Sequence, residues 1–191
     1  TAVSFATECI DRLFATATSH GRVIVVEVMG RYAGWIALNA GVASGAHAIL
    51  IPEIPYELEP VAATIRQREQ RGSKFSIVVV AEGARRVGGS VSVLGKAVGQ
   101  AERLGGVGRG DRWRGGTPPA AERWRGWRCG AAAVRALDEG VDGIMVALHS
   151  PTVKYVPLSE VTSRQKTVPL DCDTMLTARD MAINFGDAMP T

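Results

Sequence analysis

Two runs of β-branched residues constrain the fold of this chain more than any other feature. VIVVEV at residues 23–28 and FSIVVVA at residues 75–81 lack the alternation of apolar and polar residues that marks a strand with one wet face. Continuous runs of this length are typical of parallel strands that helices cover on both faces. A shorter apolar run at residues 48–51 lies between them and stops at Pro52. The chain is therefore expected to build a buried sheet from these three strands.

Helical patterns separate the three runs. Residues 2–19 and 58–71 carry apolar stripes at three- and four-residue steps, and residues 33–46 are rich in alanine and glycine. Strands that alternate with helices at this spacing predict an α/β fold, a three-layer sandwich with a mostly parallel sheet and right-handed crossovers. The stripe of the first helix should pack on that sheet through Val3, Ile10 and Leu13.

The second half of the chain is harder to interpret. Residues 120–139 predict a broken helix, residues 143–148 and 153–156 predict further strands, and residues 173–184 predict a final helix. Residues 84–128 support no assignment. Within them, seven arginines and seven glycines fall between residues 103 and 128, interleaved with tryptophans, and leave neither a helical nor a strand period.

Composition excludes several classes of protein. A hydrophobic fraction of 46% and a charged fraction of 21% are those of an ordinary globular protein, and a net charge of +3 is too small to argue for a nucleic-acid partner. No apolar run reaches the roughly 18 residues that a membrane span needs. Cys9, Cys129 and Cys172 are widely spaced, as expected of reduced thiols in a cytoplasmic protein. The first residues show no signal peptide. Because the chain opens at Thr1 inside a helical pattern, we expect a fragment.

The candidate binding residues follow the strands. Met29-Gly30-Arg31 ends the first run, and an arginine at the carboxyl end of a buried strand suits a phosphate, because its planar fork donates two hydrogen bonds at once. From chemistry alone, a surface arginine capping a turn is about as good an interpretation. Glu82 ends the strand at residues 75–81 and can accept hydrogen bonds from sugar hydroxyls, the alternative being a turn acid.

Three other charged residues have weaker signals. Glu53, after Pro52, is expected to be a loop carboxylate, and Glu27, inside a strand, to be a structural carboxylate that needs a partner. Arg22 precedes the strand at residues 23–28, so roughly 20–30 Å separate it from Arg31. The two arginines cannot grip one phosphate within one subunit. Arg22 is either a surface charge or part of a different site, such as one that lies across an oligomer interface.

One glycine turn has a weak anion-binding pattern. Arg114-Gly115-Gly116-Thr117-Pro118 places glycines before a proline that can open a helix, and a helix N-terminus of this kind favours anions.

Taken whole, these motifs resemble those of bacterial 6-phosphofructokinases. The resemblance rests on three segments: the V-E-V-M-G-R motif, the R-G-G-T-P turn at residues 114–118 and the tail at residues 156–170. The tail favours the actinobacterial-type branch. The match implies that Met29, Gly30, Arg31, Glu82, Arg22 and Arg114 bind substrate. It also implies that Arg31 acts in catalysis and that Arg22 reaches the 6-phosphate of a neighbouring subunit.

The resemblance also implies an activity. It is the phosphorylation of D-fructose 6-phosphate to D-fructose 1,6-bisphosphate with ATP in glycolysis, pyrophosphate being the alternative donor. Residues 1–191 would then be a fragment that holds mainly the fructose 6-phosphate-binding part, inactive alone. Mg²⁺ and the nucleotide would be bound mainly by an absent N-terminal part. A homotetramer or homodimer would share the site between subunits, with neither a membrane nor a nucleic acid as partner.

The chain departs from the family pattern at one place. Asp111 stands where the family has a phosphate-binding histidine, and an apolar helix segment is replaced at residues 124–129. We hypothesise that residues about 95–130 contain frameshifted sequence. Two other classes remain open: an RNA-binding protein that uses residues 103–128 as an Arg/Gly/Trp stacking segment, and a non-catalytic sugar-phosphate-binding module.

Overall fold

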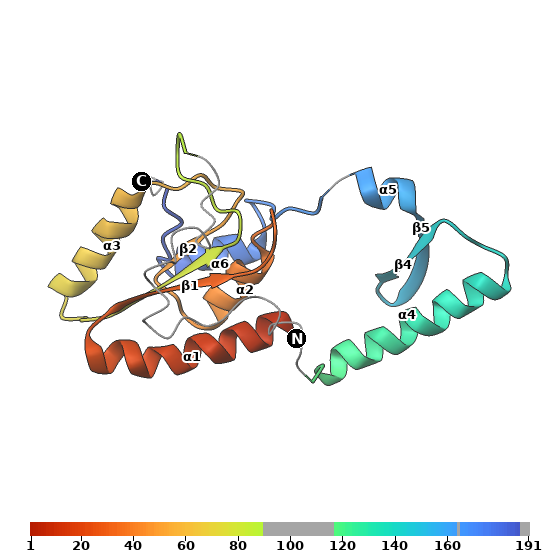
Figure 1. Cartoon of the computed structure of the whole chain (residues 1–191), viewed down its shortest axis with the longest axis horizontal. Coiled ribbons are helices and arrows are strands. Elements are labelled where there is room, and N and C mark those ends of the chain that lie inside the picture. The colour runs from red at the N-terminus through yellow and green to blue at the C-terminus, as the bar shows by residue number, and fades with distance from the viewer. Residues whose placement is uncertain (90–116, 164, 188–191) are drawn as a thin grey trace, which may run out of the picture. The chain divides into compact units, whose positions relative to one another are not determined.

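The computed structural model describes residues 1–89, 117–163 and 165–187 (Figure 1). The chain divides into two compact units. The larger unit contains Ala2–Gly115 and Thr167–Thr191, and the smaller unit contains Gly116–Lys166 together with Thr1.

The larger unit is built on a three-stranded parallel sheet in the order β1-β3-β2. Its strands are β1 (Val23–Val28), β2 (Ala48–Leu50) and β3 (Ser76–Ala81). The register pairs Val28 with Ala81, so β1 and β3 end side by side. The three predicted strands and their parallel pairing are confirmed, and the bounds differ by at most one residue.

Helices pack on both faces of this sheet, but Val23 and Val25 of the edge strand β1 are exposed, so the expectation that β1 is covered on both faces is wrong. One core cluster joins α1 (Ala2–His20), α2 (Trp35–Ala43) and α6 (Asp173–Asp180) to one face, through buried side chains that include Ile10, Leu38 and Met175. A second cluster packs Val61 of α3 (Leu58–Gln70) against Val78 and Val80 on the other face. Figure 1 shows α1 and α2 lying close together along the sheet. The α/β sandwich of three layers is therefore confirmed, as is the expected packing of Val3, Ile10 and Leu13.

The segment after α6 closes the open edge of β2. The Ile49 amide donates to the carbonyl of Asn184 at 2.8 Å, and the Asn184 amide donates to the carbonyl of His47 at 3.2 Å. Ala182 has a positive φ of 58°, which turns the chain out of the helix. The prediction of a helix to residue 184 is therefore wrong at its end, because the last residues pair with the sheet instead.

The smaller unit consists of α4 (Ala120–Asp138), an antiparallel hairpin of β4 (Ile144–His149) and β5 (Thr152–Pro157), and α5 (Leu158–Ser163). The predicted break in α4 is wrong, since the helix is continuous. A glycine inside a helix costs about 1 kcal/mol, which tertiary packing readily offsets. Here Ala132 and Ala136 are buried, and the Tyr155 hydroxyl donates to the Ala132 carbonyl at 3.1 Å. The sequence analysis also missed α5.

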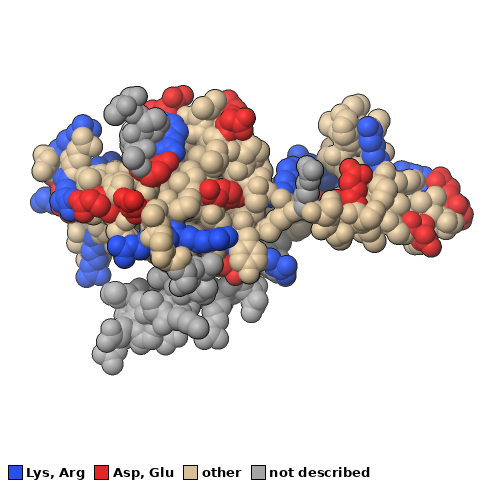
Figure 2. All heavy atoms as spheres, turned by 90° about the horizontal axis from the view of Figure 1, so that it is seen from above, with Lys and Arg blue, Asp and Glu red and all other residues tan. Residues whose placement is uncertain are grey.

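Charge and apolarity agree with the composition. Figure 2 shows acidic and basic side chains interspersed over the visible face of the larger unit, as expected of a chain with a net charge of +3. Among the described residues, no helix has the length and apolarity that crossing a bilayer requires.

Candidate functional site

Two of the predicted site segments meet at the carboxyl edge of the sheet. Met29-Gly30-Arg31 directly follows β1, and Glu82 directly follows β3. The Glu82 amide donates to the Val28 carbonyl at 2.8 Å, which extends the pairing of the two strands by one residue. In open parallel sheets this edge is where ligands bind. The structure thus brings Met29, Gly30, Arg31 and Glu82 together, as the sequence predicts.

The Glu82 carboxylate holds the backbone of the turn. Its Oε2 atom accepts hydrogen bonds from the amide of Arg31 at 3.0 Å and from the amide of Gly30 at 3.4 Å. Its Oε1 atom accepts no hydrogen bond from any residue that the structure describes. One oxygen of Glu82 therefore shapes the turn, while the other is left for a hydroxyl or amide donor of a ligand.

The turn itself has a demanding backbone. Arg31 has a φ of 53°, the left-handed region that non-glycine residues seldom adopt, and the Ala33 amide closes the turn by donating to the Gly30 carbonyl at 3.0 Å. A Cβ atom on Gly30 would lie 2.4 Å from the Ala33 carbonyl oxygen, and one on Gly83 would lie 2.7 Å from that of Arg31. Both glycines are required by close contact, and strained backbone of this kind is concentrated at functional sites.

The Arg31 side chain is exposed and has no hydrogen bond or ion pair with any described residue. A guanidinium without a protein partner can donate its full fork to an anion. Its placement depends on the backbone of the turn alone, because no described side chain supports it. Arg31 is thus available to a phosphate or phosphoryl group at the edge of the sheet.

A second carboxylate lies beside Glu82. Burial raises the pKa of Glu27 above its ordinary value, and the negative charge of Glu82 raises it further. Glu27 forms no hydrogen bond with a described residue, so the partner expected for a strand carboxylate is not seen there. Two neighbouring carboxylates repel an anion, which makes the positive charge of Arg31 the feature that fits this edge for a phosphate.

Two predicted residues do not join this group. Arg22 lies exposed at the opposite end of β1 from Arg31, with all six strand residues between them. The structure therefore agrees with the expectation that these two arginines lie too far apart to bind one phosphate within one subunit. Arg114 lies outside the described residues, as do its glycine turn and Asp111.

Sequence reasoning missed the role of Glu53. Both oxygens of its half-buried carboxylate accept from the Gly34 amide, at 3.0 and 3.1 Å, and Oε1 also accepts from the Val168 amide at 2.8 Å. Glu53 is therefore more than the expected loop carboxylate, because it anchors the far end of the turn that begins at Gly30. Its place three residues after the end of β2, at the same edge as Glu82, was the one available signal.

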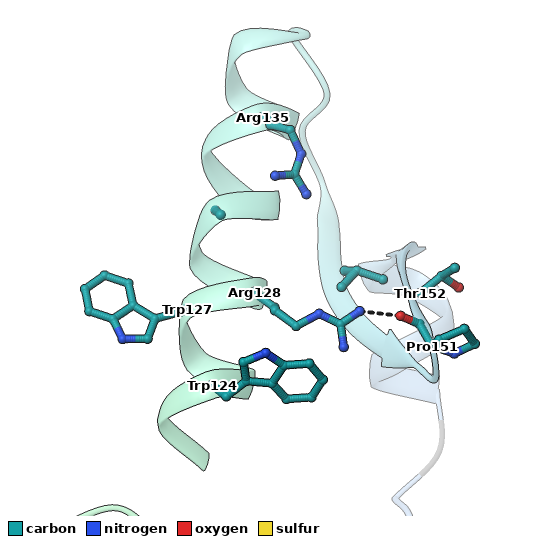
Figure 3. Close-up of a pocket in the computed structure, with 8 residues that line it drawn as sticks. Trp124, Trp127, Arg128, Arg135, Pro151 and Thr152 are labelled. Carbon is teal, nitrogen blue, oxygen red and sulfur yellow. Dashed lines mark hydrogen bonds between the residues drawn. The ribbon is translucent and has the colours of Figure 1, made fainter. Parts of the chain in front are cut away.

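A pocket in the smaller unit has a different chemistry (Figure 3). It is lined by Trp124, Trp127, Arg128, Ala131, Arg135, Pro151, Thr152 and Val153. The Arg128 guanidinium lies 4.5 Å from the centre of the Trp124 ring and donates to the Pro151 carbonyl. This arginine therefore joins α4 to the hairpin, and none of the predicted site residues lines the pocket. Among the described residues, no three side chains of metal-binding type gather in one place.

Comparisons with known proteins agree with one another. The family model described as phosphofructokinase matches residues 1–137. The ATP-dependent 6-phosphofructokinase of Chloroflexus aurantiacus is 45% identical over 208 aligned positions, which cover 99% of this chain and 57% of that protein. The enzyme of the same name from Mycobacterium leprae is 43% identical, over 88% of this chain and 55% of its own. This chain thus spans little more than half the length of these relatives.

A solved structure shares the fold. The pyrophosphate-dependent phosphofructokinase of Marinobacter aquaeolei superposes with a TM-score of 0.73 at 23% identity, over 100% of this chain and 56% of its own.

Proposed function

Because this chain belongs to the phosphofructokinase family, we propose that the carboxyl edge of its sheet forms part of the fructose 6-phosphate site of an ATP-dependent 6-phosphofructokinase. The reaction is the glycolytic phosphorylation of D-fructose 6-phosphate to D-fructose 1,6-bisphosphate. The observation that carries the proposal is the hydrogen bond from the Arg31 amide to Glu82, since the Arg31 guanidinium and the second oxygen of Glu82 have no hydrogen-bond partner among the described residues. ATP is favoured over pyrophosphate as donor by the names of the relatives at 43–45% identity.

Each residue at this edge has a role in the proposal. The Oε1 atom of Glu82 accepts a hydrogen bond from a sugar hydroxyl, and Met29 and Gly30 line the sugar. The Arg31 guanidinium neutralises charge that builds on the phosphoryl group as it moves, which is where a fixed cation lowers the barrier most. Arg22 reaches the 6-phosphate bound by a neighbouring subunit, and Arg114 is another ligand of the 6-phosphate.

The rest of the enzyme is proposed to lie outside this chain. ATP and Mg²⁺ are bound mainly by an N-terminal part, the whole protein is a cytoplasmic homodimer or homotetramer, and residues 1–191 hold mainly the sugar-phosphate part. We also retain the hypothesis that residues about 95–130 are frameshifted. Resequencing the gene tests it directly, because an intact reading frame through this stretch would exclude a frameshift.

The sugar-phosphate site is tested by titrating the ¹⁵N-labelled chain with fructose 6-phosphate and following its amide signals. We expect saturable shifts at Gly30, Arg31 and Glu82, and no such shifts with fructose. Replacing Arg31 with alanine should abolish them. Arg71→Ala is the matched control, since Arg71 is equally exposed but follows α3, away from the candidate site. Signals at Arg31 and Glu82 that stay still at millimolar ligand would contradict the proposal.

A further inference from the structure

We propose that Glu53 is the positioning residue for Arg31, an inference that rests on the role proposed for Arg31 above. Glu53 touches neither the Arg31 side chain nor its backbone. It acts through Gly34, which ends the turn that carries Arg31.

The Glu53 carboxylate gathers backbone donors from two distant parts of the chain. Gly34 is 19 residues away in sequence and Val168 is 115 residues away, yet their amides share one carboxylate. Hydrogen bonds to a charged acceptor are shorter and roughly twice as strong as neutral ones. A carboxylate is therefore well suited to this position, because both of its oxygens accept and neither donates.

The site is built for close approach. A Cβ atom on Gly34 would lie 2.5 Å from the Ile51 side chain and 2.9 Å from Glu53 Oε2. Only glycine lets the amide at this position come within hydrogen-bonding distance of the carboxylate without displacing Ile51, which follows β2. A glutamine at position 53 would keep the length of the side chain but would turn an NH₂ group towards one of the backbone donors.

Two carboxylates thus hold the turn from opposite ends. Glu82 binds the amides of Gly30 and Arg31, and Glu53 binds the amide of Gly34. Between them Arg31 has a φ of 53°, which its side chain disfavours. Such a conformation persists only where the surroundings fix it. Releasing the Gly34 end frees the turn to relax, and the Arg31 guanidinium, which no described side chain supports, moves with it.

The contact with Val168 extends this support to the returning chain. Val168 is 3% exposed and belongs to the core cluster of the larger unit, in the segment that starts at Thr167. A shift of that segment would reach the turn of Arg31 through the shared carboxylate. Residues 167–168 are therefore part of what supports the site, although they lie far from it in sequence.

The test compares Glu53→Gln with Glu57→Gln in the full chain. Glu57 is an exposed carboxylate four residues further on with no side-chain hydrogen bond at the start of α3, so it controls for the loss of charge. Hydrogen exchange at the Arg31 and Gly34 amides should become roughly 10-fold faster in Glu53→Gln, and fructose 6-phosphate should bind roughly 10-fold more weakly, because a hydrogen bond to a charged group is lost. Both quantities should stay at their wild-type values in Glu57→Gln. Wild-type exchange at Arg31 in Glu53→Gln would overturn the proposal.

A second variant covers the case in which Glu53→Gln does not fold. Glu53→Asp keeps the charge but withdraws the carboxylate by one methylene, so hydrogen exchange at the Gly34 and Arg31 amides should again be faster than in the wild-type chain. Wild-type exchange at Arg31 in Glu53→Asp would overturn the proposal. Failure of the proposed function is separate, because it would appear as a wild-type chain that binds no fructose 6-phosphate while exchange at Arg31 still responds to the change at Glu53.

Discussion

The Oε2 atom of Glu82 lies 3.0 Å from the backbone nitrogen of Arg31, 51 residues away in sequence. The two charged residues of the proposed sugar-phosphate site, Glu82 and Arg31, are therefore linked to each other before any ligand binds. Glu82 fixes the backbone from which the Arg31 guanidinium projects, and its second oxygen accepts no hydrogen bond from a described residue. A site preorganised in this way loses less conformational freedom when its ligand binds.

Gly83 should be sensitive to the addition of a single methyl group. Its φ is 85°, and a Cβ would lie 2.7 Å from the Arg31 carbonyl oxygen. Gly83→Ala should destabilise the chain by roughly 1–3 kcal/mol and displace the turn. Gly72→Ala is the control, since its φ is 90° and a Cβ there meets nothing within 4 Å. Urea unfolding of both variants separates the cost of the clash from that of the backbone conformation, and equal losses would contradict the close contact.

Stability should fall in acid because of His47. Burial, and then the nearby Arg68 cation, lower the pKa of His47 from 6.5 to about 4, and its Nδ1 accepts from the Ile77 amide at 2.8 Å. The fold favours the neutral ring, so this contribution is complete above pH 6.5 and is lost as the pH falls towards 4. It amounts to about 2–3 kcal/mol.

The ring signals of His47 in a pH titration measure this directly. They should show a midpoint near pH 4, well below the ordinary histidine pKa of 6.5. A His47 midpoint near 6.5 would contradict the burial and the hydrogen bond on which the prediction rests.

Removing the charge of Glu27 should stabilise the chain at neutral pH. Burial and Glu82 raise the pKa of Glu27, so the fold disfavours its ionised form, and that cost grows as the pH rises through the folded pKa. Glu27→Gln should therefore raise the unfolding free energy at pH 7, and the gain should disappear below about pH 4. The exposed Glu69 is the control, because Glu69→Gln should change little at either pH. A loss of stability in Glu27→Gln at pH 7 would refute this prediction.

The two arginines at opposite ends of β1 should behave differently in the complete enzyme. Arg31→Ala should lower kcat on the order of 10³-fold with a smaller effect on KM, because in the proposed role its charge acts mainly in the transition state. Arg22→Ala should raise KM and change kcat less, because it loses a contact with the bound 6-phosphate. Steady-state kinetics on both variants checks the contrast, and the reverse pattern would show that the roles are wrongly assigned.

The sequence predicted the sheet well because its signal is local. The β-branched run of β3 predicted a strand that is buried at every residue, and the structure confirms it, whereas Val23 and Val25 of the edge strand β1 are exposed. The helix expected at residues 33–46 begins two residues later, at Trp35, because the preceding residues are held in the turn. Burial and turn residues together were thus enough to place Arg31 and Glu82 at one edge.

The role of Glu53 was beyond this kind of reasoning. Its partners are the backbone amides of Gly34 and Val168, and an amide carries no residue-specific signal in a sequence. The continuity of α4 was missed for a related reason. Glycine and arginine interrupt the recurrence of apolar residues in 120–138, which weakens the helical signal in the sequence. The contacts that support the helix come from the hairpin that follows.

A crystal structure of the chain soaked with fructose 6-phosphate tests the central claim most directly. We predict electron density for the ligand at the carboxyl edge of β1 and β3. The Arg31 guanidinium and Glu82 Oε1 should each lie within about 2.7–3.2 Å of a ligand oxygen. Ligand bound elsewhere, such as in the pocket between Trp124 and Arg135, with Arg31 and Glu82 left without contact, would contradict the account.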